Sequence, residues 1–325
     1  MPKEIMRTIR YHEHGDPTEV LRLEHAPIPS PNPGHIAVGV KACGLNPADW
    51  ALCRGLSTQQ LPGGIGLDVS GIVTAVGDDV FGVAVGDAVF GPSAFMDYPT
   101  AGASDIAILS HWDKLPDELS HEAAAALPMV VETAARYLDW ADLKKDQTIL
   151  INGAGTMVGF AAAQMAILRG ATVIASAGQT FAEQLRSMGS VVIPHGEGMV
   201  EHVQALGGLT PDILLDAAPA NLQSHSASAL PALVEIAGGD TTRVITIADQ
   251  EGAKQTGART GADNIKSEGG FKLRWSVLSK FGQLAAEGAF SIPIAQTFAL
   301  EDWREALNIS LSGRARGKLI LFPHR

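Results

Sequence analysis

The sharpest chemical signal in the chain is the glycine-rich segment Gly153-Ala154-Gly155-Thr156-Met157-Val158-Gly159. An apolar run at 148–151, typical of a strand, precedes it, and a helical pattern at 160–169 follows it. Glycines allow the tight turn between such elements, and bare backbone lets a pyrophosphate approach the N–H groups at a helix N-terminus. The third glycine follows the first by six residues, so the common dinucleotide fingerprint is met only approximately. An ordinary strand-to-helix turn is the alternative; we favour a nucleotide site formed by Gly153, Gly155, Thr156, Met157, Val158 and Gly159.

The residues after the second strand of this region, 172–175, indicate which dinucleotide would bind. NAD enzymes usually carry an Asp or Glu at this point to hold the ribose 2′-hydroxyl. The sequence here is Ala175-Ser176-Ala177-Gly178-Gln179, which has no acid to repel a 2′-phosphate and no Lys or Arg to attract one. We therefore predict NADPH, with Ser176 and Gln179 beside the ribose. His195 either supplies a donor near the adenosine or is an exposed turn residue, and we also assign to the cofactor site Ala218 and Ile247.

Two kinds of secondary structure must position these residues. Strand and helix patterns alternate from 148 to 247, which predicts a parallel, doubly wound sheet of the α/β class. The region 8–113 consists of short strands separated by turns, which suits a compact β barrel or sandwich. A helix is expected over 271–286, and the apolar run 317–322 is expected to be a strand that returns to the first domain.

Composition limits the classes of function. A length of 325 residues predicts two domains, and the net charge of −11 argues against a broad basic surface for nucleic acid or anionic lipid. Two cysteines, Cys43 and Cys53, are too few for a disulfide scaffold or a four-cysteine zinc lobe. The first fifteen residues contain no apolar run, and the longest apolar stretch is broken by Pro128. We expect a cytoplasmic protein with no membrane span.

Several segments together resemble one family. They are the stretch around Asn46-Pro47-Ala48-Asp49, the turns 66–73 and 85–91, Ala125-Ala126-Leu127-Pro128 with Thr133-Ala134, and 317–321. They resemble the medium-chain dehydrogenase/reductases, specifically the zinc-free quinone oxidoreductase (zeta-crystallin-like) branch, over nearly the whole chain. The resemblance implies a GroES-like β-barrel domain, 1–123 plus 263–325, and a Rossmann NADP-binding domain, 124–262. It also implies a homodimer that transfers hydride from NADPH to a quinone or an α,β-unsaturated carbonyl.

The same resemblance bears on the metal. In the zinc alcohol dehydrogenases that share this fold, a Cys stands where Asn46 is and a His where Leu67 is, so a catalytic zinc is not expected here. Donors must then stabilise the charge that develops on a carbonyl oxygen, and we assign this catalytic role to the Asn46 amide and the Thr133 hydroxyl. The alternatives are a turn residue before Pro47 for Asn46 and a helix-packing residue for Thr133. Asp49 is expected to bond neighbouring backbone.

A further set of residues concerns the substrate pocket and the choice of substrate. We assign Trp50, Phe95 and Tyr98 to the pocket, although aromatic residues are more often core. Glu132 either pairs with an Arg or gives the pocket a charge, and we favour the pair. Leu56-Ser57-Thr58 stands where enoyl-thioester reductases have a catalytic Tyr, which counts against that chemistry. Two alternatives stay open: reduction of a specialised-metabolite enone or imine, and a non-catalytic NADP(H)-binding sensor or structural protein.

Overall fold

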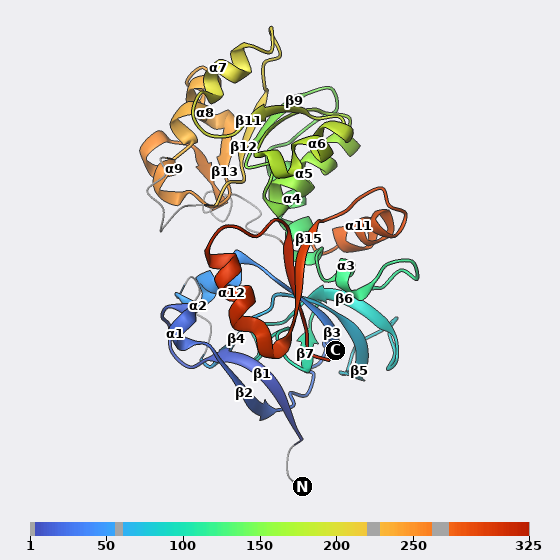
Figure 1. Ribbon diagram of the computed structural model, residues 1–325. Helices are drawn as coiled ribbons and strands as arrows, with labels where there is room; N and C mark the ends of the chain where they lie inside the picture. Colours follow the sequence, from blue (N-terminus) through green and yellow to red (C-terminus); the bar gives the residue numbers. More distant parts are fainter. Residues whose placement is uncertain (1–3, 56–60, 220–227, 262–272, 325) are drawn as a thin grey trace. The chain divides into compact units, whose positions relative to one another are not determined.

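The computed structural model describes residues 4–55, 61–219, 228–261 and 273–324 (Figure 1). The chain divides into two compact units: Met1–Met129 with Trp275–Arg325, and Val130–Arg274. We call them the barrel unit and the nucleotide unit. The first boundary lies at 129/130, where the sequence predicts 123/124, and the second at 274/275, where it predicts 262/263. The predicted Leu56-Ser57-Thr58 segment lies outside the described residues.

The barrel unit is built around one large sheet. Its strands follow the order β15 (Ile294–Ala299), β16 (Lys318–Phe322), β3 (Ile36–Leu45), β5 (Asp68–Val76), β6 (Ala88–Pro92) and β8 (Asp113–Lys114). A further strand, β7 (Ile106–Leu109), pairs with β3, and a second sheet has the order β2 (Arg22–Pro27), β1 (Ile5–Tyr11), β4 (Gly63–Gly64). Because β16 pairs antiparallel with β3, the C-terminal strand returns to the first domain, as the sequence predicts.

Short helices complete this unit and close its core. They are α1 (Pro17–Val20), α2 (Pro47–Cys53), α3 (His121–Ala124), α11 (Val277–Ala286), α12 (Trp303–Leu311) and the 3₁₀ turn η2 (Leu300–Asp302). The predicted helix 271–286 is thus shorter among the described residues, and 271–272 lie outside them. The core packs alternate side chains of β3 and β5 against α12, and both cysteines are buried within it.

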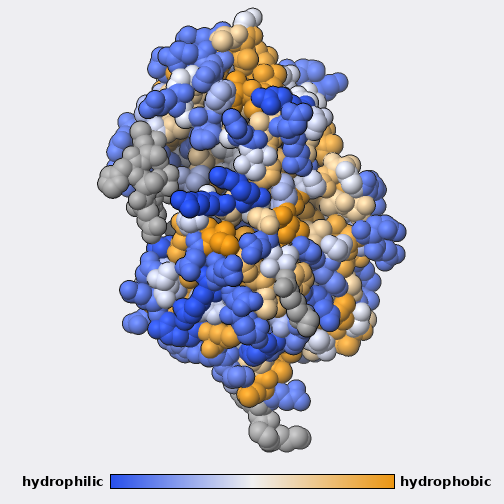
Figure 2. Space-filling view, in the orientation of Figure 1, coloured by the Kyte–Doolittle hydropathy of each residue, from blue (hydrophilic) through white to orange (hydrophobic). Residues whose placement is uncertain are grey.

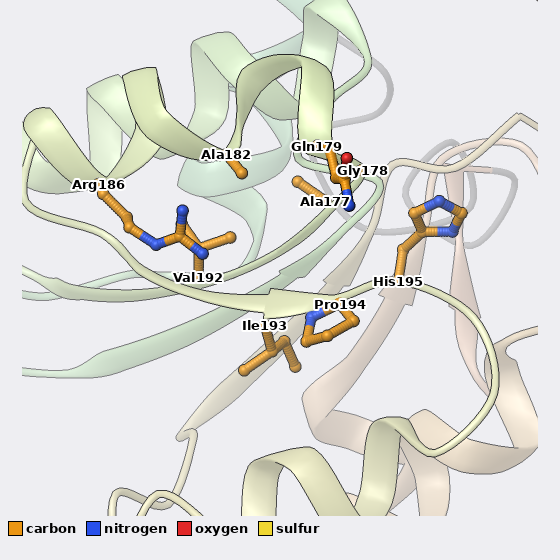
Figure 3. A pocket seen from close by; sticks show the side chains of 9 residues that line it. All are labelled: Ala177, Gly178, Gln179, Ala182, Arg186, Val192, Ile193, Pro194 and His195. Carbon is orange, nitrogen blue, oxygen red and sulfur yellow. The ribbon is translucent and has the colours of Figure 1, made fainter.

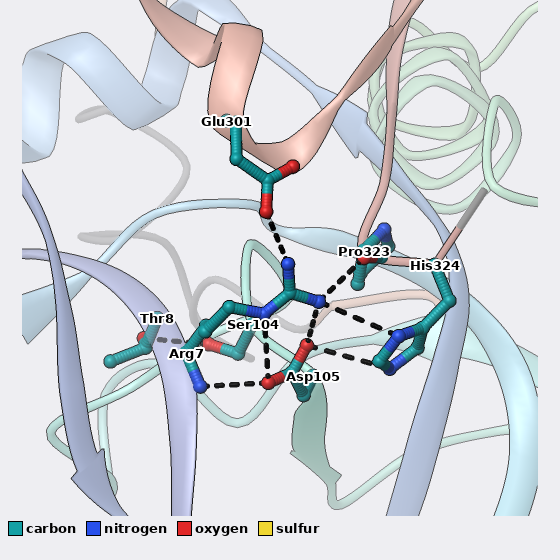
Figure 4. A network of polar contacts seen from close by, with 7 residues as sticks. All are labelled: Arg7, Thr8, Ser104, Asp105, Glu301, Pro323 and His324. Atoms are coloured by element: carbon teal, nitrogen blue, oxygen red, sulfur yellow. Dashed lines mark hydrogen bonds and ion pairs between the residues drawn. The ribbon is translucent and has the colours of Figure 1, made fainter.

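A polar network joins the two ends of the chain within the barrel unit (Figure 4). Arg7 on β1 donates to Asp105 at 2.7 Å and to the carbonyl oxygen of Pro323 at 2.6 Å. The same guanidinium pairs with Glu301, and His324 lies 3.4 Å from Asp105. The first strand and the last residues are therefore tied to one loop.

The nucleotide unit is a six-stranded parallel sheet. The strand order is β11 (Val191–Pro194), β10 (Thr172–Ala177), β9 (Thr148–Asn152), β12 (Ile213–Asp216), β13 (Val244–Thr246), β14 (Arg259–Thr260). Its helices are α5 (Met157–Leu168), α6 (Gln179–Ser187), α7 (Met199–Gln204), α8 (Leu230–Ile236), α9 (Gln250–Thr256) and the 3₁₀ turn η1 (Thr241–Arg243), while α4 (Pro128–Trp140) runs through the boundary. The doubly wound α/β architecture that the sequence predicts is confirmed.

One helix of this unit has a weak signal in the sequence. The stretch from 252 to 270 reads as polar and glycine-rich, yet α9 occupies 250–256. The Asp249 side chain accepts the Gly252 N–H at its start, and Gly257, with φ of +79°, ends it. Caps at both ends therefore define a helix that has only two buried residues.

Candidate functional site

The glycine-rich loop connects β9 to α5 at the carboxyl edge of the sheet. Gly153 has a φ of +73°, and a Cβ there would lie 2.6 Å from the Ala218 nitrogen. A Cβ on Gly159 would lie 2.3 Å from the carbonyl oxygen of Gly153. The packing of the chain itself therefore requires glycine at these two positions, whether or not a ligand binds.

Gly155 is different, because nothing in the protein requires it. A Cβ there would meet no atom nearer than 3.8 Å, and its backbone needs no left-handed conformation. The space beside Gly155 is consistent with the close approach of a ligand group to bare backbone. At the start of α5, the Thr156 hydroxyl caps the Gly159 N–H at 3.1 Å and donates to the Ala217 carbonyl at 3.1 Å. Within the described part of the chain, the N–H groups of Met157 and Val158 have no partner, so they are available to a phosphate.

A row of buried polar side chains lies at the ends of the strands next to this loop. Ser176, Asn152, Asp216 and Thr246 stand in register on four adjacent strands. Asn152 donates to Asp216 at 2.9 Å, Thr246 donates to its other oxygen at 2.9 Å, and Ser176 donates to Asn152 at 3.2 Å. Burial raises the pKa of Asp216, and these hydrogen bonds oppose the rise.

The same row positions two residues assigned to the cofactor site. The Ala218 N–H donates to the Asp216 side chain at 3.2 Å, and the Ile247 N–H donates to the Asp216 carbonyl at 2.9 Å. Ser176, in contrast, is fully buried and its hydroxyl faces Asn152. It is not among the residues that line the pocket at the end of this strand.

A pocket lies where β10 and β11 end and α6 begins (Figure 3). Gln179 and His195 line it, as does Ala177, the residue after Ser176. The remaining lining residues are Gly178, Ala182, Arg186, Val192, Ile193 and Pro194. A Cβ on Gly178 would lie 3.4 Å from the His195 ring, so the two residues are neighbours in the pocket. Among the lining residues that the sequence does not single out, Arg186 is the charged one. Its spacing from Gln179 and Ala182 on one helix face was the available signal.

Asn46 belongs to a second polar group, in the barrel unit. Its amide nitrogen donates to Asp68 at 2.9 Å, and its amide oxygen accepts from the Lys318 ammonium at 2.7 Å. Lys318 also contacts Asp68 at 2.7 Å, and the Met129 N–H donates to the other Asp68 oxygen at 2.8 Å. We call Asn46, Asp68 and Lys318 the amide–ammonium cluster. Neither Asp68 nor Lys318 was selected from the sequence, because 250 residues separate them.

Asp49 lies beside this cluster and bonds backbone, as the sequence predicts. Its two oxygens accept the N–H groups of Asn46 at 2.7 Å and Gly66 at 2.6 Å. Burial raises its pKa to about 7, although the two hydrogen bonds favour the charged form. The nearby charges have opposite effects: Asp68 raises the pKa further and Lys318 lowers it.

The other assigned residues lie elsewhere. Trp50 is buried in the barrel core and donates to Ser310 at 2.7 Å, and Tyr98 accepts the Asn32 N–H at 2.8 Å. Phe95 is partly exposed on the loop after β6. Thr133 is partly exposed on α4, in the nucleotide unit. Trp50 is therefore a core residue, and none of the three aromatic residues belongs to the amide–ammonium cluster.

Glu132, the neighbour of Thr133, is fully buried and paired. Arg136 donates to it at 2.8 and 3.2 Å, and the Arg274 N–H donates at 3.0 Å. The charge of Glu132 is thus satisfied within the nucleotide unit. This is the pair that the sequence analysis favoured.

Comparison with known proteins identifies relatives that share this architecture. Residues 32–110 match the alcohol dehydrogenase GroES-like domain, and residues 189–321 match the zinc-binding dehydrogenase family. A quinone oxidoreductase from Lama guanicoe is 36% identical over 170 residues, which is 50% of this chain and 50% of the relative. The quinone oxidoreductase of Coxiella burnetii superposes with a TM-score of 0.79 at 25% identity, over 99% of this chain and 100% of the other.

The chain belongs to the medium-chain dehydrogenase/reductase superfamily, on its quinone oxidoreductase branch. The mouse synaptic vesicle membrane protein VAT-1 homolog-like is also similar, at 32% identity over 200 residues, 60% of this chain and 47% of the relative. The chain spans about half the length of the curated relatives it matches. Membership of this superfamily, with its Rossmann-like domain, implies a nicotinamide cofactor.

The surface of this reductase-family chain is mixed in character. Figure 2 shows hydrophilic side chains over most of the visible face, with small apolar areas between them. The most exposed large apolar side chain among the described residues is Phe81, at 86%. Across the described ranges, the helices are all too short or too polar to cross a bilayer.

Proposed function

We propose that this chain is a metal-independent oxidoreductase that transfers hydride from NADPH to a quinone or an α,β-unsaturated carbonyl. The observation that carries the proposal is the space at Gly155, which the protein leaves open beside the first N–H groups of α5. That combination fits a pyrophosphate, and superfamily membership supplies the nicotinamide.

The pocket of Figure 3 supports NADPH over NADH. No acid lines it, and its lining includes His195, Gln179 and the cationic Arg186. Such groups can donate to a 2′-phosphate, whereas a carboxylate at this point would repel it. Arg186 is weakly engaged by Glu183, at 3.9 Å, so it can turn toward an anion.

The amide–ammonium cluster supports metal independence. The Asn46 oxygen, the ligand atom this residue could offer, is bonded to an ammonium at 2.7 Å. A divalent cation bound to that oxygen would face the positive charge of Lys318 directly. Leu67, at the other ligand position, is an apolar side chain buried to 1% exposure.

The residues of the chain have separate tasks in this reaction. When bound, NADPH supplies the hydride, and the acceptor takes the hydride and one proton from water to give the hydroquinone or the saturated carbonyl. The glycine-rich loop holds the pyrophosphate, and the loop ends at Ala218 and Ile247 are fixed by Asp216. Asn46 and Thr133 offer donors for the oxygen that gains negative charge. No group of the chain is assigned as the proton donor.

The test is NADPH oxidation with 9,10-phenanthrenequinone and a panel of other quinones and enones. We expect turnover with NADPH on at least one acceptor, with no loss on chelation and no stoichiometric zinc by elemental analysis. Tight NADPH binding without turnover on any acceptor would instead favour a non-catalytic sensor. Turnover on shaped enones or imines alone would favour a specialised-metabolite reductase.

We also propose that the protein works as a cytoplasmic homodimer, on the resemblance to its branch. Light scattering of the purified protein should give about twice the chain mass of 34.0 kDa. A monomer mass at micromolar concentration would contradict this.

A further inference from the structure

Lys318 is an unusual residue for its place in the fold. It is 3% exposed at the start of β16, in the run Lys-Leu-Ile-Leu-Phe, where the other residues are apolar. Its partner Asp68 is fully buried. A buried ion pair gains little net stability over apolar residues of similar volume, because desolvating both charges offsets their attraction. Stability alone therefore gives a weak account of this pair.

The pair fixes the orientation of the Asn46 amide. An ammonium only donates hydrogen bonds and a carboxylate only accepts them, so the amide oxygen must face Lys318 and the nitrogen must face Asp68. Lys318 also contacts the same Asp68 oxygen, which closes a ring of four polar atoms. Of the two hydrogens on the Asn46 amide nitrogen, the one on the same side as the amide oxygen makes the bond to Asp68 within this ring.

The other amide hydrogen points out of this ring. In the part of the chain that the structure describes, it has no acceptor, and Asn46 retains 7% exposure. A charge-assisted bond on the oxygen of an amide polarises the group and makes its N–H a stronger donor. The cluster thus presents one oriented, strengthened donor.

We propose that Lys318 is a positioning residue for hydride transfer: its ammonium holds and polarises the Asn46 amide, which donates to the oxygen that becomes negative. The inference rests on the proposed function. In this role Lys318 acts through its hydrogen bonds to Asn46 and Asp68 and transfers no proton to the substrate, and its positive charge takes the place of the metal ion of a zinc enzyme.

The first test replaces the pair without leaving an unpaired buried charge. Lys318→Met with Asp68→Asn keeps the local net charge at zero and keeps similar side-chain lengths. We expect NADPH affinity and quinone KM to stay nearly unchanged, while single-turnover NADPH oxidation slows by about 10²-fold. A folded double variant that reacts at the parent rate would overturn the proposal.

A surface pair of the same sheet is the matched control. Lys114 on β8 contacts Asp87 at 3.1 Å, and its side chain is 61% exposed. Lys114→Met with Asp87→Asn removes the same two charges away from the cluster. This control variant should react at the parent rate. If it slows as much as the buried double variant, the slowing is a general effect of removing charge, and the positioning role of Lys318 is overturned.

A second experiment measures the pKa of a bound phenol. It requires neither turnover nor a Lys318 variant that folds. 4-Nitrophenol, a coloured stand-in for the hydroquinone anion, is titrated into the parent protein and into Asn46→Ala in the presence of NADP⁺. The oriented donor should lower the pKa of the bound phenol in the parent only. No lowering in the parent, or an equal lowering in both proteins, would contradict the inference. A parent that shows this shift but oxidises no NADPH would refute the proposed function and leave the cluster's role intact.

Discussion

At the scale of single residues, the chain places two buried carboxylates side by side with different partners. Asp68 faces the Lys318 ammonium at 2.7 Å, whereas among the described residues Asp49 is held by backbone N–H groups alone. Asp49 is a residue of the first turn of α2, and Asp68 is the first residue of β5. Burial raises the pKa of Asp49, because two hydrogen bonds do not replace the solvation that its carboxylate loses.

Asp49 should make the stability of the barrel unit depend on pH. Its pKa in the folded protein is about 7, above its usual value of 3.8, so the folded state binds the proton more readily than the unfolded state. Stability from this group is therefore greatest below pH 4 and falls as pH rises toward 7, by roughly a few kcal/mol. Asp49→Asn should flatten this slope, although the Asn46 or Gly66 N–H then loses an acceptor and the overall stability drops.

Urea unfolding at a series of pH values measures this effect. The difference between parent and variant is the quantity of interest, because the other titrating groups are common to both. Parallel curves over pH 4–7 would show that Asp49 is ionised throughout this range in the folded protein.

At the scale of elements, the nucleotide unit was predictable because its signals are local. Most strands of the sheet are short apolar runs followed by a helical pattern, and parallel order follows from that alternation. The exception is β14, which consists of Arg259 and Thr260 and carries no apolar signal. The side on which a strand residue points is less certain from sequence. Neighbouring residues in a strand point to opposite faces of the sheet. The Ser176 side chain is therefore buried on one face, whereas the side chain of Ala177, the next residue, lines the pocket.

The amide–ammonium cluster was not predictable in the same way. Its members come from three elements, and 272 residues separate Asn46 from Lys318. No local pattern encodes such a contact; a lone Lys opening an apolar strand was the only hint. Asn46 was identified through the family resemblance, which indicates the position of a site residue in the sequence but not the residues that it contacts. Trp50 shows the converse limit, since a large apolar side chain suits a core as well as a pocket.

The pocket between β10, β11 and α6 gives the prediction at this scale. Ala177→Asp puts a carboxylate beside Gly178 and His195, where it would repel a 2′-phosphate and could accept from a 2′-hydroxyl. We expect the ratio of NADPH to NADH affinity to fall by roughly tenfold or more, equivalent to about 1.4 kcal/mol. Fluorescence titration with both dinucleotides measures the ratio. Ala171→Asp, immediately before the opposite end of the same strand, adds the same charge away from the pocket and should leave the ratio unchanged. An unchanged ratio in Ala177→Asp would remove this pocket from cofactor selection.

At the scale of the whole molecule, the two ends of the chain meet in one ion network (Figure 4). β1 begins the barrel unit and the residues after β16 end the chain, and Arg7 contacts both Asp105 and the Pro323 carbonyl. Burial raises the pKa of Asp105, but the hydrogen bonds and charge of Arg7 lower it by more. The network therefore stabilises the folded barrel above the usual carboxyl pKa, and this contribution is lost as pH falls through the lowered value.

Arg7→Ala should consequently destabilise the barrel unit by about 1–2 kcal/mol, more than an ordinary surface pair, because one guanidinium serves several acceptors. Arg54→Ala is the matched control: in the described part of the chain, the Arg54 side chain pairs with Asp16 alone, at 3.2 Å, and the two side chains are 32% and 39% exposed. Urea unfolding of both variants at neutral pH should show the larger loss for Arg7→Ala, and at pH 3 the difference between the variants should shrink as Asp105 takes up its proton. High salt should reduce the loss for Arg54→Ala proportionally more, since exposed pairs are screened more strongly than partly buried ones. Equal losses at neutral pH would mean that closing the chain ends on each other adds nothing beyond one surface ion pair.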